Sequence, residues 1–162
     1  MAVTVDVTRA GAGELMLAYR VTDPKGALVV PAPAAGARKD DLWTRTCFEA
    51  FICIPGGDAY YELNISPSTE WGAYRFDGFR AGMAMADVID TPRVAWRKTG
   101  DGFQLEALAD LSGLAGLPVD RPWRLGLTAV IEDAPGQLSY WALTHPPGVP
   151  DFHNAAGWVA KV

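Results

Sequence analysis

Short alternating or apolar runs, each ended by glycine, proline, aspartate or asparagine, recur along the whole sequence. Short strands at this spacing, separated by these turn residues, are typical of all-β sandwiches and barrels. The pattern therefore predicts an all-β fold, a two-sheet antiparallel β-sandwich of jelly-roll type with about ten strands. The expected strands cover residues 3–8, 14–21, 47–54, 60–66, 71–76, 94–97, 103–109, 123–131, 138–143 and 157–162.

The connections between these runs contain recognisable turns and two long loops. Ile-Pro-Gly-Gly-Asp at 54–58 and Lys-Thr-Gly-Asp-Gly at 98–102 predict hairpin turns. The only expected helix is a short one at 111–117, with Asp110 as its N-cap. No repeat or interdomain linker is visible, so residues 1–162 are expected to form one domain. The long loops at 23–41 and 144–156 are the expected carriers of function.

Charge and hydropathy disfavour several classes of partner. The net charge is −5 and no run of lysine and arginine interrupts it, which argues against nucleic acid. No apolar stretch is long enough to cross a membrane. The first eight residues alternate apolar and polar side chains, which indicates a strand rather than a signal peptide.

The two cysteines, Cys47 and Cys53, lie six residues apart on one expected strand. That spacing separates them by about 20 Å in extended chain, whereas a disulfide requires Cα atoms within about 7 Å. We therefore expect two free thiols. Free thiols and no recognisable leader predict a cytoplasmic protein.

Alternation assigns side chains to the two faces of each expected strand. The apolar face supplies the expected core, which comprises Phe48, Ile52, Leu63, Ile65, Leu105, Leu125 and Leu127. On neighbouring strands the opposite face would bring Glu49, Glu62 and Asn64 together. A solvated outer face is one interpretation of this polar stripe. The lack of lysine and the flanking aromatic residues favour a sugar site instead, in which rings stack on the sugar and polar groups bind its hydroxyls; these aromatics are Trp43, Tyr60, Trp71 and Tyr74.

Two segments carry a resemblance to a known group of β-sandwiches. They read Asp-Leu-Trp-Thr-Arg-Thr-Cys-Phe-Glu-Ala-Phe at 41–51 and Tyr-Tyr-Glu-Leu-Asn-Ile-Ser-Pro at 60–67, and the match continues at 71–77, 103–107 and 140–143. The chain resembles the DOMON-like sandwiches similar to carbohydrate-binding module family 9, and most of all a bacterial branch of that group. The resemblance covers most of the chain from residue 40 onward.

This resemblance implies a sandwich that binds sugars or haem. In sugar-binding members, two tryptophan rings clamp a sugar end, and glutamate, arginine and asparagine bind its hydroxyls. Trp43 and Glu49 match such positions, Glu62 stands where an arginine is expected, and Trp141 is the candidate second ring. Arg75 is expected to neutralise one carboxylate. The full predicted site comprises Trp43, Glu49, Glu62, Asn64, Trp71, Arg75, Trp141 and His153.

The sequence favours a non-catalytic sugar-binding module with no cofactor and no metal, and it leaves alternatives open. Exposed tryptophan and tyrosine also anchor protein–protein interfaces, so a protein partner is one alternative. Glu49 and Glu62 could form the carboxyl pair of a glycan hydrolase. A haem would need axial ligands such as Met83 or Met85 with His145 or His153. The loop at 145–154 also holds two histidines and an aspartate that could bind a metal.

Overall fold

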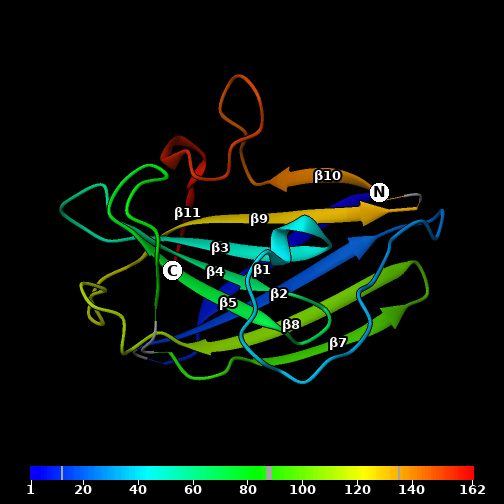
Figure 1. Ribbon diagram of the computed structural model, residues 1–162, viewed down its shortest axis with the longest axis horizontal. Helices are drawn as coiled ribbons and strands as arrows, with labels where there is room; N and C mark the ends of the chain where they lie inside the picture. The colour runs from blue at the N-terminus through cyan, green and yellow to red at the C-terminus, as the bar shows by residue number, and fades with distance from the viewer. Residues whose placement is uncertain (12, 87–88, 135) are drawn as a thin grey trace.

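The computed structural model describes residues 1–11, 13–86, 89–134 and 136–162, and in them two antiparallel sheets face each other (Figure 1). The smaller sheet has the order β1-β2-β8-β7. Its strands are β1 (Ala2–Arg9), β2 (Glu14–Thr22), β7 (Arg93–Thr99) and β8 (Gly102–Asp110).

The larger sheet carries the remaining strands in the order β10-β9-β3-β4-β5-β6, with β11 also paired to β9. They are β3 (Cys47–Cys53), β4 (Tyr60–Ile65), β5 (Trp71–Phe76), β6 (Ala84–Met85), β9 (Arg124–Asp133), β10 (Gln137–Ala142) and β11 (Ala160–Lys161). The all-β sandwich predicted from the alternating runs is thereby confirmed. Each of the ten expected strands is present, although the last shrinks to β11 and is preceded by the 3-10 turn η2 (Ala155–Gly157).

The main core lies between the inner faces of the two sheets. Leu17 and Tyr19 on β2 and Leu105 on β8 come from the smaller sheet, and Phe48 on β3 comes from the larger one. Phe48 packs against Tyr19 and Phe103, with ring centroids 4.7 and 6.1 Å apart. All seven residues predicted for the core belong to this cluster: Phe48, Ile52, Leu63, Ile65, Leu105, Leu125 and Leu127.

Residues 111–117 do not form the expected helix. They make two successive turns, in which Leu114 N–H donates to Leu111 C=O and Leu117 N–H donates to Leu114 C=O. Asp110 Oδ1 does accept a hydrogen bond from Ser112 N–H, as a cap would. A longer helix is prevented because Gly116 has a positive φ of 81° and Pro118 follows soon after.

Both cysteines are free, as the strand spacing predicts. No described helix has the length and apolarity needed to cross a membrane. A short 3-10 helix, η1 (Leu42–Thr44), which the sequence analysis did not anticipate, leads into β3 and carries Trp43.

Candidate functional site

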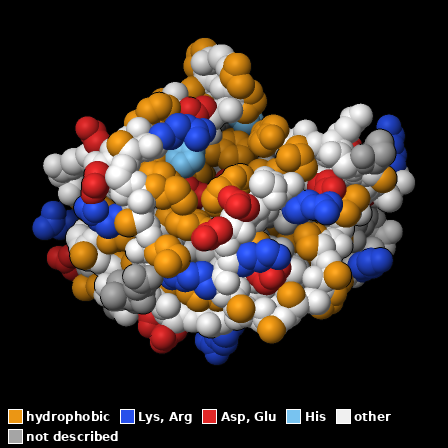
Figure 2. All heavy atoms as spheres, viewed as in Figure 1, with side chains coloured by type: hydrophobic (Ala, Val, Ile, Leu, Met, Phe, Trp, Pro, Cys, Tyr) orange, Lys and Arg blue, Asp and Glu red, His pale blue; other side chains and the backbone are white. Residues whose placement is uncertain are grey.

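The outer face of the larger sheet is buried, which excludes the solvated polar face that its sequence pattern also allowed. Every residue of β4 is buried, as is every residue of β3 except the last. Glu49, Glu62 and Asn64 have relative exposures of 2%, 5% and 0%. Two segments cover this face, one between β5 and β6 and the other between β10 and β11. In Figure 2, hydrophobic side chains gather over this part of the surface.

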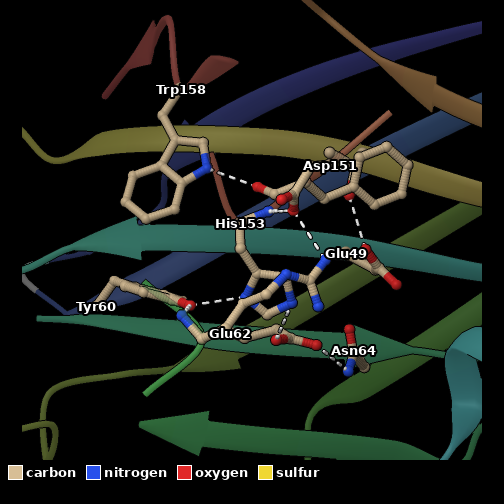
Figure 3. A network of polar contacts seen from close by, with 10 residues as sticks. Glu49, Tyr60, Glu62, Asn64, Asp151, His153 and Trp158 are labelled. Atoms are coloured by element: carbon tan, nitrogen blue, oxygen red, sulfur yellow. Dashed lines mark hydrogen bonds and ion pairs between the residues drawn. The ribbon is translucent and has the colours of Figure 1, made fainter. Parts of the chain in front are cut away.

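Sheet register brings the three polar residues together. Glu49 on β3 lies opposite Asn64 on β4 and opposite Thr128 on β9. Glu62 is two residues from Asn64, so it is a diagonal neighbour of Glu49, within reach of long side chains. The predicted juxtaposition of Glu49, Glu62 and Asn64 is therefore confirmed, and Figure 3 draws the three from these adjacent strands.

Each of these side chains holds one hydrogen bond within the site. Thr128 Oγ1 donates to Glu49 Oε2 at 2.9 Å, and Asn64 Nδ2 donates to Glu62 Oε1 at 2.7 Å. The amide oxygen Asn64 Oδ1 is buried and accepts no hydrogen bond from the described residues. This part of the outer face therefore presents more hydrogen-bond acceptors than donors.

Burial determines the protonation of the two glutamates. Loss of solvent, together with the nearby Glu62 charge, raises the pKa of Glu49 to about 8, and the Thr128 hydrogen bond offsets only part of this. Burial likewise raises the pKa of Glu62, against hydrogen bonding from Asn64 and the positive charge of Arg80. Glu49 is therefore largely protonated at neutral pH.

His153 reaches this face from the segment between β10 and β11. Its Nδ1 lies 2.6 Å from the hydroxyl of Tyr60, and that hydroxyl oxygen also accepts from Arg80 N–H at 3.3 Å. When the Tyr60 hydroxyl donates to Nδ1, the proton of the neutral imidazole is on Nε2. His153 Nε2 lies 3.8 Å from Glu62 Oε2, too long for a direct hydrogen bond.

The imidazole of His153 stays neutral at physiological pH. Burial first, and then the Arg80 charge, lower its pKa to about 4, while Asp151 acts in the opposite direction. The contact with Glu62 is consequently not an ion pair at neutral pH. The predicted site residue His153 does lie beside Glu62, with its Nε2 on the side of Glu62 Oε2.

Aromatic packing fixes the segment that carries His153. Trp158 stacks on Phe51 with ring centroids 5.9 Å apart, and its indole N–H donates to Phe152 C=O at 2.9 Å. The indole fits because Gly126, opposite Phe51 on β9, has no side chain: a Cβ there would lie 2.2 Å from Trp158 Cδ1. The glycine in the middle of β9 thus makes room for the anchor of the covering segment.

Together these elements enclose a cavity of about 350 Å³. Its polar lining consists of Glu49, Glu62, His153 and Arg80, whose guanidinium group binds Asp151 Oδ1 at 2.8 Å. The rest of the lining is apolar, and aromatic rings dominate it: Trp43, Phe51, Phe76, Met83, Val130, Tyr140, Pro150 and Phe152. The volume is within the range of small-molecule sites.

Trp43 lines this cavity, as the sequence predicts, and a second aromatic residue supports its ring. Its ring meets the edge of Tyr74 at a centroid distance of 5.9 Å. Tyr74 is held in turn by a 2.6 Å hydrogen bond from its hydroxyl to Asp40 Oδ1.

Three predicted site residues lie elsewhere, each because strand alternation turns it away from the cavity. Trp141 pairs with Ala129 of the core, so it packs on the inner side while its neighbour Tyr140 faces the cavity. Trp71 is likewise buried in the core, beneath the Arg38 guanidinium.

Arg75 pairs across the sheet with the core residue Tyr61. Its guanidinium binds Asp77 and does not neutralise a site carboxylate. Arg80, which the sequence analysis did not select, is the cavity's arginine.

The alternatives of metal and haem binding find little geometry to support them. Among the described residues, no group of three or more His, Cys, Asp or Glu could hold a metal ion. Met83 lines the cavity, but the ring nitrogens of His153 lie toward Tyr60 and Glu62. His145 and Met85 are exposed and do not line it.

Comparison with known proteins gives a likeness among solved structures but none in sequence. No family model matches the chain, and no curated protein matches its sequence. Among solved structures, the fold is similar to that of a putative carbohydrate-binding protein from Bacteroides uniformis, with a TM-score of 0.65 and 14% identity. The alignment covers 97% of this chain and 76% of that one. At this identity the likeness establishes a shared β fold.

Proposed function

We propose that this protein is a carbohydrate-binding module that holds a mono- or oligosaccharide in the cavity above Glu49 and Glu62. The observation that carries the proposal is the composition of the cavity. Aromatic rings form its walls, while two carboxyl groups and an imidazole line its interior. Rings can pack on the C–H faces of a sugar, and fixed polar groups can orient its hydroxyls. The likeness to a putative carbohydrate-binding protein is consistent with this assignment.

The pairing of Trp43 with buried glutamates also agrees with the resemblance to DOMON-like and family 9 modules, and we propose membership of that group on this basis. The two-ring clamp of that group would need a different second ring here, because Trp141 is on the inner side of its sheet. Tyr140 and Phe152 both line the cavity and are the available partners for Trp43.

Replacing Trp43 by alanine is expected to weaken sugar binding by at least about tenfold, since the ring supplies apolar contact that water replaces poorly. Binding is measured by isothermal titration calorimetry against a panel of mono- and disaccharides. Trp141→Ala is the matched control, because it removes the same ring from the opposite face of the sheet. Equal affinities for wild type and Trp43→Ala would exclude this cavity as the site, and a wild type that binds no sugar would end the carbohydrate proposal.

A second candidate function, glycoside cleavage, is favoured by one specific observation. Glu49 has a pKa of about 8, so it holds a proton at neutral pH as a general acid must. Glu62 would then supply the second carboxyl group of the pair. Reducing ends released from oligosaccharides by wild type, but not by Glu49→Gln, would support cleavage. Binding without any release would leave the binding module as the function.

A further inference from the structure

The described residues give neither carboxyl group of the cavity an ion-pair partner of its own. Glu49 and Glu62 are both buried carboxyl groups, and among the lining residues only Arg80 carries a fixed positive charge. The guanidinium of Arg80 is bound to Asp151, and its side chain is 54% exposed at the edge of the site. Burial without a cation favours the protonated form, as at Glu49, and a bound cation would allow the carboxyl groups to ionise.

The hydrogen bonds accepted by Glu49 and Glu62 also leave each carboxyl group without a full set of partners. The donors that reach the glutamates, Thr128 Oγ1 and Asn64 Nδ2, each occupy a single oxygen. Glu49 Oε1 and Glu62 Oε2 accept no hydrogen bond from the described residues, and His153 Nε2 is 3.8 Å from the latter. Once Glu49 has lost its proton, two carboxyl oxygens are open to a ligand, and a ligand group with several hydrogens would satisfy both.

The walls of the cavity suit a positive charge as well. Five of its lining residues are aromatic: Trp43, Phe51, Phe76, Tyr140 and Phe152. The faces of such rings attract ammonium groups, and the attraction grows when the ammonium is removed from water. Rings around a pair of carboxyl groups thus offer a cation both kinds of partner that proteins use to bind one.

We propose that the sugar bound here is an amino sugar with a free, protonated amine, whose ammonium group binds the carboxyl groups of Glu49 and Glu62. This inference rests on the proposed function and narrows it to one class of sugar. An ammonium group carries three donors, which matches the two open carboxyl oxygens. An N-acetyl group removes the charge and adds bulk, and a hydroxyl group supplies only one hydrogen, so both should bind less well.

Calorimetry on the full chain with three matched series of sugars tests the proposal. Glucosamine, galactosamine and mannosamine are each compared with the N-acetyl sugar and the neutral parent sugar. We expect at least one amine to bind about tenfold or more tighter than both of its partners, as a charged hydrogen bond allows. Glu49→Gln and Glu62→Gln should remove most of that advantage. Glu106→Gln, which removes the same charge from an exposed position on β8, should leave it unchanged.

Proton release provides a second measurement. Glu49 is protonated in the free protein at about pH 6.5, where a primary amine is charged, so forming the ion pair must release a proton. Titrations in two buffers of different ionisation enthalpy should detect this release in wild type and not in Glu49→Gln. Amine binding without proton release would overturn the role of Glu49.

The remaining outcomes separate the two proposals. If neutral or N-acetyl sugars bind as tightly as the amines, the amino-sugar inference fails and carbohydrate binding stands. If no sugar binds but a hydroxyl-free amine such as cyclohexylamine does, carbohydrate binding fails and the amino-sugar inference fails with it. If nothing in either set binds, both proposals are overturned.

Discussion

Glu49→Gln should stabilise the protein at alkaline pH by about 3 to 5 kcal/mol, while changing its stability little near pH 5. The folded pKa of Glu49 is about 8, against an ordinary value of 4.5. Between these two values the folded state holds a proton that the unfolded state has lost, so wild-type stability falls as pH rises. Each pKa unit corresponds to about 1.4 kcal/mol. Glutamine mimics the protonated carboxyl group and is not subject to this loss.

The other titratable groups near Glu49 either preserve the expected stability difference between wild type and Glu49→Gln or add to it. Glu62 and the Arg80–Asp151 pair share the cavity with it, and removing the Glu49 charge would only ease ionisation of Glu62. His153, with a pKa lowered to about 4, makes wild type and variant alike less stable as pH falls below about 6.5, so its effect cancels in the comparison. Cys47 and Tyr19, whose pKa values burial raises, titrate above the window of interest.

Urea denaturation of both proteins between about pH 5 and 8.5 measures the difference. Glu106→Gln, at an exposed position, should show no such slope. A stability difference between wild type and Glu49→Gln that is constant across this range would mean that the carboxyl group of Glu49 is solvated, and the buried site would need revision.

The sequence predicts the floor of the site well because strand alternation is a strict rule. Glu49 and Glu62 each interrupt an apolar run, and the alternation of β3 and β4 alone places them on one face. The same rule also indicates why Trp141 was misplaced. Both it and Tyr140 are aromatic, so the hydropathy of β10 does not say which of them faces the core. The pairing of Trp141 with Ala129 places Trp141 on the core face, and strand pairing is known only from the folded structure.

The walls of the site could not be predicted in this way. Arg80 and Phe152 lie in irregular segments, where no periodicity assigns a direction to a side chain. Their placement depends on contacts made only after folding, such as the hydrogen bond from Trp158 to Phe152. The available signal was weak: Gly126 lies between Leu125 and Leu127 inside strand β9, and a glycine there indicates close approach of another group. That group is Trp158.

Alanine substitutions of Phe48 and Phe51, three residues apart on β3, should separate the contribution of this sheet to stability from its contribution to sugar binding. Phe48 is fully buried between the sheets against Tyr19 and Phe103, so Phe48→Ala should cost about 3 to 5 kcal/mol of unfolding free energy. That is a large share of the total stability of a typical domain. The ring of Phe48 lies in the core, on the opposite side of the sheet from the cavity, so a variant that remains folded should bind sugar with wild-type affinity.

Phe51→Ala should lose comparable stability and sugar affinity together. Phe51 is also buried, but on the outer face, where its ring contacts Trp158 and His153 at centroid distances of 5.9 and 5.1 Å. Removing it leaves the covering segment without its support and enlarges the cavity. Phe79→Ala, at a 61% exposed position, is the control and should change stability by less than about 0.5 kcal/mol. Denaturation and calorimetry on the three variants test this prediction. If Phe51→Ala keeps wild-type affinity, the ligand does not bind on this face, because Phe51 both lines the cavity and packs against His153.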